Sequence, residues 1–308
     1  MICLGLDTSN YTTSAAWYDG TAGVNAGRLL EVKSGQLGLR QSEALFQHVK
    51  RLPEIMEGLE FPEGGVSAVG ASTRPRAVEG SYMPCFLAGE SQGRSLARVL
   101  DVPFYGFSHQ QGHIAAVLYS AERLSMMDKP MLAWHLSGGT TELLYVEHGL
   151  RARKIGGTED LSAGQLIDRT GQLLGLDFPA GKALDALGAR GKAKGFSIRV
   201  QESRFSLSGM ENQVQAKLKA ETPQEEIAAF ALASVCTAVK RATEQALLRY
   251  GNLPVIFTGG VSSNSMLRTV MEPVGGIFGS PRYSTDNAMG IAVLTDLAKS
   301  RNLEIQNG

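Results

Sequence analysis

Cysteine is scarce in this sequence of 308 residues, which contains three, at positions 3, 85 and 236. Their odd number, their apolar neighbours and the lack of a C-x-x-C spacing argue against a disulfide framework. Net charge is also missing, because 30 basic residues balance 30 acidic ones. No overall field therefore steers the chain towards nucleic acid or anionic lipid, and any such contact must be local.

Long hydrophobic runs are absent as well. The longest, residues 227–239, is too short to span a bilayer. The chain opens on a predicted strand, "MICLGLD", without a basic signal-like region, so we expect a cytoplasmic protein with no membrane partner. What the sequence does have is 43% hydrophobic residues and 36 glycines. These predict a large core, roughly two domains and many tight turns.

One pattern occurs twice. Residues 1–20 and 130–149 each show two runs with β character joined by a short polar turn, which predicts two hairpins. Helical patterns follow each hairpin, at 39–58 and 85–100 and then at 162–175, 181–190 and 224–249. The sequence therefore predicts an α/β fold of two similar lobes with a ligand cleft between them. We expect the first lobe to span residues 1–128, completed by 287–308, and the second to span 129–286.

Two histidines suggest a metal site. His109 and His113 are four residues apart, so on a helix they would project from one face and could share an ion. The alternative is a polar helix face. A third ligand could come from Asp286, which precedes an apolar helical pattern, although that position equally suits a helix N-cap.

Two glycine-rich loops suggest anion binding. "LSGGTTEL" (136–143) places glycines between two predicted strands, and "PVIFTGGVSSNSMLR" (254–268) reads as a strand, a glycine turn and a helix start. Backbone N–H groups in such loops can contact phosphate oxygens. Each loop alone is equally consistent with an ordinary α/β connection.

Taken together, these stretches resemble the TsaD family of tRNA threonylcarbamoyladenosine synthase subunits, formerly described as O-sialoglycoprotein endopeptidases. The matching motifs run nearly end to end in family order: "LGLDTS", "HQQGH", "LSGGTTEL", "SAGQLIDRTGQLLGLDFPAG", "FSLSG", "TGGVSSN" and "STDNAMG". The resemblance implies an actin-like (RNase H-like) fold of two lobes with a ligand and metal cleft.

The resemblance also implies roles for individual residues. It assigns one divalent ion, iron or zinc, to His109, His113 and Asp286. It assigns the adenine nucleotide, or threonylcarbamoyl-AMP, to positions that match the family's substrate-binding residues, namely Asp7, His135, Leu136, Ser137, Gly138, Gly139, Asp168, Gly181 and Asn264. No general base is evident among them.

The implied reaction moves a threonylcarbamoyl group from threonylcarbamoyl-AMP to the exocyclic amine of the adenosine beside the anticodon, in tRNAs that read ANN codons. An amine of this kind is a poor nucleophile, so the enzyme must position an activated acyl group and stabilise charge on its carbonyl oxygen. The implied partners are tRNA, a second subunit of the same fold and an ATPase subunit. The basic runs 150–154 and 190–195 give only a hint of an RNA surface.

Several positions depart from the family pattern, and other classes of protein compete. Thr140 stands where the family has His, Glu211 where it has Lys, and residues 72–80 replace a glycine-rich stretch; further departures are Asn10, Tyr11, Ala180 and Lys182. They leave open a divergent paralog that acts on another acceptor, or a non-catalytic partner subunit. A zinc peptidase would need Glu after the first histidine, where this chain has Gln110. A sugar-kinase-like or chaperone-like ATPase would have no use for the metal triad.

Overall fold

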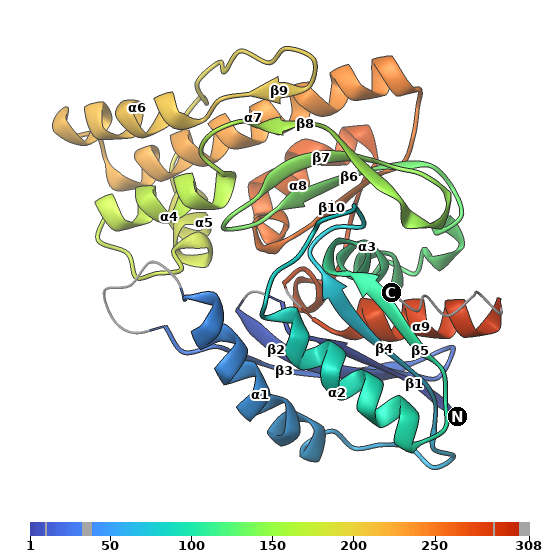
Figure 1. The fold of residues 1–308 in the computed structure, drawn as a ribbon. Coiled ribbons are helices and arrows are strands. Elements are labelled where there is room, and N and C mark those ends of the chain that lie inside the picture. Colours follow the sequence, from blue (N-terminus) through green and yellow to red (C-terminus); the bar gives the residue numbers. More distant parts are fainter. Residues whose placement is uncertain (10, 33–38, 286, 302–308) are drawn as a thin grey trace. The chain divides into compact units, whose positions relative to one another are not determined.

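The chain folds into two compact α/β units. A computed structural model describes residues 1–9, 11–32, 39–285 and 287–301. Unit 1 comprises Met1–Met127 and Thr285–Gly308, and unit 2 comprises Asp128–Ser284. Figure 1 shows the helices and strands of each unit.

Unit 1 contains a five-stranded sheet in the order β3-β2-β1-β4-β5. Strand β1 pairs antiparallel with β2 and parallel with β4; β2 pairs antiparallel with β3, and β4 parallel with β5. The strands are β1 (Ile2–Asp7), β2 (Thr12–Tyr18), β3 (Gly23–Leu29), β4 (Val66–Arg74) and β5 (Phe104–Ser108).

Helices cover this sheet on both faces, as the fully buried first strand requires. Leu4 and Leu6 share a hydrophobic cluster with Leu52 of one helix and Ala97 of another, whereas Gly5, which points the other way, faces a third. The helices are α1 (Gln41–Glu57), α2 (Phe86–Val99), α3 (His109–Ser120) and α9 (Met289–Ser300). The predictions of helices at 39–58 and 85–100 are confirmed.

Helix α9 approaches its neighbours more closely than side chains would permit. A Cβ atom at Gly5 of β1 would overlap the backbone nitrogen of Ala292 in α9. A Cβ atom at Gly290 of α9 would overlap the carbonyl oxygen of Gly112 in α3. Glycine at these positions therefore sets the distances of α9 from β1 and from α3.

Unit 2 repeats the strand arrangement of unit 1. Its six-stranded sheet has the order β11-β10-β6-β7-β8-β9, with β6 antiparallel to β7 and parallel to β10. The strands are β6 (Met131–Leu136), β7 (Thr141–Val146), β8 (Ala152–Thr158), β9 (Arg204–Phe205), β10 (Val255–Thr258) and β11 (Gly276–Phe278). The two predicted hairpins are thus β1–β2 and β6–β7, and the predicted repeat is confirmed.

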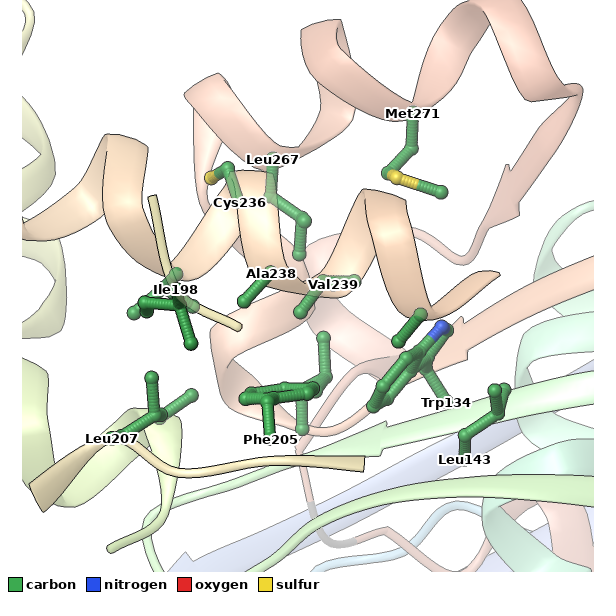
Figure 2. Close-up of a cluster of buried hydrophobic side chains, with 14 of the residues drawn as sticks. Trp134, Leu143, Ile198, Phe205, Leu207, Cys236, Ala238, Val239, Leu267 and Met271 are labelled. Carbon is green, nitrogen blue, oxygen red and sulfur yellow. The ribbon is translucent and has the colours of Figure 1, made fainter. Parts of the chain in front are cut away.

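The core of unit 2 lies between its sheet and the long helix α7. Figure 2 shows Trp134 of β6 and Phe205 of β9 packed with Val239 of α7 and Leu267 of the following helix. The remaining helices pack on α7 or on one another. The helices are α4 (Ala163–Leu173), α5 (Gly181–Gly188), α6 (Ser208–Lys219), α7 (Gln224–Tyr250) and α8 (Ser265–Met271). Short 3-10 helices occur at Leu124–Met126, His148–Leu150, Gly260–Ser263, Glu272–Val274 and Pro281–Tyr283.

The three cysteines are core residues, as predicted. Cys3, Cys85 and Cys236 are buried free thiols. Burial raises the pKa of Cys3, and it raises that of Cys236 to about 12, so neither thiol is poised as a nucleophile. Within the parts of the chain that the structure describes, no helix combines the length and apolar character needed to cross a membrane.

The close approach of α9 to α3 gives a stability prediction with a matched control. Gly290→Ala should destabilise unit 1 by about 3 kcal/mol, because the new methyl group must displace backbone. The control is Gly209→Ala. Gly209 is the second residue of α6, as Gly290 is of α9, and both helices are twelve residues long. A Cβ atom added at Gly209 would have no atom within 4 Å. That variant should gain up to about 1 kcal/mol from helix propensity. Urea unfolding followed by circular dichroism compares the two; equal effects would contradict the overlap.

Candidate functional site

The two histidines occupy the first turns of α3. This helix begins directly after β5 because Ser108 caps it: its hydroxyl accepts from the Gln111 N–H at 3.2 Å, and the Gln111 side chain accepts from the Ser108 N–H at 2.9 Å. The rings of His109 and His113 lie 4.2 Å apart between centroids, tilted by 71°. Only 13% of the His109 side chain and 4% of His113 is exposed, so they do not form a solvated polar face.

A buried carboxylate holds the first of these rings. Asp7, at the end of β1, accepts hydrogen bonds from the Ser9 hydroxyl at 2.8 Å and from the Ser72 hydroxyl at the end of β4. Its Oδ2 lies 3.2 Å from Nδ1 of His109. Nε2 of His109 lies 3.5 Å from the Ser9 hydroxyl, at the outer limit of a hydrogen bond. A carboxylate on Nδ1 fixes the ring and leaves Nε2 to act as a donor atom, an arrangement common around metal-ligating histidines.

The sequence motifs did not reveal the contact between Asp7 and His109. A usable signal existed, because the carboxyl ends of neighbouring parallel strands meet at one edge of a sheet. Strands β1, β4 and β5 are such neighbours, and they end near Asp7, Ser72 and Ser108.

The described residues supply part of a metal site. Over residues 1–9, 11–32, 39–285 and 287–301, no group of three or more His, Cys, Asp or Glu side chains is suited to a metal ion. The third predicted ligand, Asp286, lies outside these residues. Two adjacent imidazoles, one oriented by a carboxylate, fit the ligand chemistry of zinc or iron.

In unit 2, the predicted glycine turn rests on the N-terminus of α4. Ser137 and Thr140 close the turn: the Ser137 N–H donates to the Thr140 carbonyl at 2.8 Å. A Cβ at Gly164, in the first turn of α4, would overlap the Ser137 carbonyl oxygen, and the Ser162 hydroxyl donates to the Gly138 carbonyl at 2.8 Å. Beyond Gly138 and Gly139 themselves the space is open, since a Cβ at either would have no atom within 4 Å.

Two further predicted residues meet beside this turn. One carboxylate oxygen of Asp168, on α4, accepts from the Ala180 N–H at 2.9 Å, directly before Gly181 opens α5. Burial raises the pKa of Asp168, although the Ala180 hydrogen bond opposes that effect. The structure therefore joins Asp168 to the start of α5.

The side chain of Asn264 is engaged within the fold. Its oxygen accepts from the Leu267 N–H at 2.9 Å, which caps α8, and its nitrogen donates to Asp185 of α5 at 2.8 Å. The sequence motifs did not single out Asp185. The predicted strand, glycine turn and helix start are confirmed as β10, Gly259 and α8.

The remaining predicted positions differ in what they can offer. His135 is half-buried on β6, whereas the Leu136 side chain lies fully in the core, so only its backbone can meet a ligand. In unit 2 the turn at 137–139 rests on the start of α4, Asp168 of α4 accepts from the residue before Gly181, and Asn264 donates to Asp185 of α5. Asp7, His109 and His113 belong to unit 1.

Three residues that depart from the family pattern make contacts within their own unit. Glu211 of α6 forms an ion pair with Arg169 of α4 at 2.7 Å. Ala180 is buried, and a Cβ at Gly171 would overlap its methyl group. Arg74 donates to the neighbouring Thr73 hydroxyl at 3.2 Å.

Comparison with known proteins identifies relatives over nearly the whole chain. The TsaD family, described as tRNA N6-adenosine threonylcarbamoyltransferase, matches residues 68–293. A protein named tRNA N6-adenosine threonylcarbamoyltransferase from Chlorobium luteolum is 30% identical, over 99% of this chain and 95% of the relative. One of the same name from Prochlorococcus marinus is 32% identical, over 83% of this chain and 77% of the relative.

Solved structures show the same fold at low identity. Component A of (R)-2-hydroxyglutaryl-CoA dehydratase from Acidaminococcus fermentans has a TM-score of 0.61 at 17% identity, over 97% of this chain and 99% of that protein. Full-length HypF in its phosphate- and nucleotide-bound form has a TM-score of 0.62 at 13% identity, over 98% of this chain and 56% of HypF. The predicted α/β, actin-like fold is confirmed.

The pKa of Asp168 gives a prediction for stability against pH. A carboxyl group whose pKa is higher in the folded protein than in the unfolded chain binds its proton more tightly after folding. It therefore stabilises the fold fully at pH values below its unfolded pKa, about 3.9. This contribution is lost as the pH rises through the folded pKa. Asp168→Asn should therefore match wild type near pH 3.5 and become the more stable protein at neutral pH. Urea unfolding at a series of pH values measures the difference.

The exposed Asp177, in the loop between α4 and α5, provides the control. Asp177→Asn should leave the pH dependence unchanged. A lower stability of Asp168→Asn at neutral pH would mean that the bond from Ala180 to the ionised carboxylate outweighs the effect of burial.

Proposed function

The chain belongs to the TsaD family of tRNA N6-adenosine threonylcarbamoyltransferases, and from this premise we propose that it transfers threonylcarbamoyl from threonylcarbamoyl-AMP to tRNA. The acceptor is the exocyclic amine of the adenosine beside the anticodon in tRNAs reading ANN codons. The observation that carries the proposal is the open glycine turn at 137–139, set on the N-terminus of α4, the helix whose Asp168 accepts from the residue before Gly181.

This cluster suits an adenylate. The N–H groups of Gly138 and Gly139 can donate to phosphate or carbonyl oxygens, because no side chain lies over them. The α4 N-terminus adds a positive dipole end at the same turn. We assign a ribose hydroxyl to Asp168. A hydrogen bond from this hydroxyl would stabilise the ionised form of a carboxylate whose pKa burial raises. The residues thus bind and orient an activated acyl donor without a covalent intermediate.

The metal ligands we propose are His109, His113 and Asp286. The Asp7 contact on Nδ1 supports Nε2 of His109 as the donor atom. Asp286 precedes α9 by three residues in the sequence, and α9 crosses α3 at Gly112, next to His113. A divalent ion held by three protein ligands supplies Lewis acidity to substrate oxygens.

Metal content tests this ligand set. His109→Ala and His113→Ala, purified after expression in iron- and zinc-supplemented medium, should each lose most of the bound metal seen by mass spectrometry. Asp7→Asn should bind metal about 10- to 100-fold more weakly in a titration, the usual effect of losing an orienting carboxylate.

His148→Ala is the matched control, because His148 is 75% exposed and pairs with Asp128 in unit 2. It should carry as much metal as wild type. Wild-type metal content in both His109→Ala and His113→Ala would refute the ligand set.

The proposed partners are a second subunit of the same fold and an ATPase subunit. The chain has no net charge, so its phosphate contacts must come from local basic surfaces, and we expect partner subunits to supply the rest of the tRNA affinity. An exposed apolar row on α1 supports pairing through unit 1: Phe46 is 61% exposed and Val49 49% exposed, one turn apart. Leu87 on α2 is exposed as well.

A reconstituted transfer assay tests the function. Labelled threonylcarbamoyl should reach tRNA when the chain is combined with its partners, and only weakly with the chain alone. Gly139→Val should abolish transfer while keeping the wild-type melting temperature, because the added side chain has free space in the protein but occupies the proposed ligand position. Phe46→Glu should reduce transfer by weakening the pairing of subunits.

Gly58→Val is the control for bulk, since Gly58 has a negative φ and a Cβ there meets only ordinary contacts. It should transfer at the wild-type rate. Full activity of the isolated chain would refute dependence on partners. Adenine-nucleotide binding without transfer to tRNA in any combination would favour a paralog with another acceptor.

A further inference from the structure

A long irregular segment connects α5 to β9 along the surface of α7. In order, Gly191 lies against Glu225 and Gly195 against Ala233; the Phe196 N–H then donates to the Ser234 hydroxyl at 2.8 Å. Further along, the Val200 carbonyl accepts from Gln245 at 3.0 Å, and Arg241 donates to the Ser197 hydroxyl at 3.0 Å and the Ile198 carbonyl at 3.2 Å. The backbone of residues 190–200, here called the basic segment, is therefore fixed to α7 over most of its length.

Alternation within the basic segment separates small residues from cations. Gly191, Ala193 and Gly195 are partly buried, and a Cβ at Gly195 would lie 2.6 Å from the backbone of Ala233. The residues between and after them, Lys192, Lys194 and Phe196, are exposed. In an extended chain, alternate side chains stand about 6 to 7 Å apart on one side. Only small residues fit on the inner side, so the cations are presented outward.

The next residues complete this arrangement. Ile198 is buried in the core of unit 2, where Figure 2 shows it beside Cys236 and Leu207. Arg199 is again exposed. The buried isoleucine anchors the end of the row, and the row continues with a further cation.

The cations of this surface lie in a stretch of chain that has no acidic residue of its own. Residues 186–201 contain four cations and no Asp or Glu. On α7, Arg241 donates to the segment, and its neighbour in the sequence, Lys240, is a further cation. Across the described part of the chain, none of the six takes part in an ion pair, whereas basic residues elsewhere do, including Arg28, Arg51, Arg94, Arg98, Lys154, Arg169 and Arg204.

We propose that the basic segment docks the phosphate backbone of the tRNA substrate, with Phe196 stacking on an unpaired base. This inference rests on the proposed function for the identity of the RNA. A fixed row of unpaired cations around one exposed ring matches the requirements of single-stranded RNA, namely phosphate neutralisation and a stacking surface. Phe196, 44% exposed, is the one large apolar side chain exposed on the segment, which gives an apolar protein interface little area.

The position of the segment relative to the proposed nucleotide cluster supports this assignment. Helix α5 begins at Gly181 and leads directly to the segment, and its eight residues span about 12 Å. Gly188, at its end, packs against Ala228 and Leu232 of α7. An RNA whose reacting nucleotide lies by Gly181 would meet the cations a few nucleotides away.

The salt dependence of tRNA binding tests the proposal. A variant with Lys192→Ala, Lys194→Ala and Arg199→Ala should bind fluorescent tRNA at least about tenfold more weakly at 50 mM salt, by anisotropy. The slope of log affinity against log salt should become less steep by about two to three, roughly one for each phosphate that the variant no longer neutralises. Phe196→Ala should weaken binding of tRNA about tenfold and leave binding of an RNA duplex unchanged.

The control removes the same number of cations elsewhere. Arg28, Arg94 and Arg98 each pair with a carboxylate in unit 1, so their triple alanine variant should keep the wild-type slope. A wild-type slope for the segment variant would overturn the proposal. An equal weakening of binding to polyglutamate would overturn it too, because the segment would then be a general polyanion surface.

A second readout separates this inference from the proposed function. The segment variant should bind adenine nucleotide with wild-type affinity in calorimetry, since its three substitutions lie outside the nucleotide cluster. The segment variant could lose tRNA binding while the wild-type protein shows no transfer in any combination. That result would support the docking surface and would refute only the proposed reaction.

Discussion

The arrangement of unit 1 depends on backbone contacts that only glycine permits. Helix α9 packs on β1 at Gly5 and on α3 at Gly112, using its own Gly290 at the second crossing. Gly5 and Gly290 belong to the first strand and the last helix of the chain, so unit 1 closes only when this helix returns to that strand. His113 directly follows Gly112, the residue at which α9 crosses α3. A side chain at Gly112 or Gly290 would therefore shift α9 relative to the turn of α3 that carries the histidines. The geometry of the histidine pair therefore depends on the absence of side chains as much as on any attractive contact.

The two units share one strand arrangement but present different chemical groups at their strand ends. In unit 1 the carboxyl ends of β1, β4 and β5 gather titratable and hydroxyl side chains, with Asp7 at their centre. In unit 2 the corresponding strands β6 and β10 end in glycine turns, and what they offer is backbone. Side chains at a strand end suit a metal or proton, whereas bare amides suit phosphate oxygens. The same fold can thus hold a metal ligand set in one unit and a nucleotide in the other.

Much of this fold could be predicted from sequence, because its signals are local. The hairpins are pairs of short runs with β character joined by polar turns, and the helices at 39–58, 85–100 and 224–249 show helical patterns, so these strands and helices lie where the sequence predicts them. The contacts of Asp7 with His109, and of Asn264 with Asp185, join residues far apart in the chain and follow no periodic pattern. Asn264 also illustrates a limit of motifs, since the residue that caps α8 and ties it to α5 looks in sequence like a ligand contact.

The basic run 190–195 shows how structure changes the meaning of composition. Its charges count the same in the sequence as those of any solvated helix face, and the chain as a whole is neutral. Packing against α7 turns the small residues inward and leaves the cations exposed. Beside Asp168, by contrast, Arg169 is paired with Glu211 of α6. Unit 2 therefore offers cations without ion pairs along the basic segment, where a polyanion would extend, and a local surface of this kind is concealed by a net charge of zero.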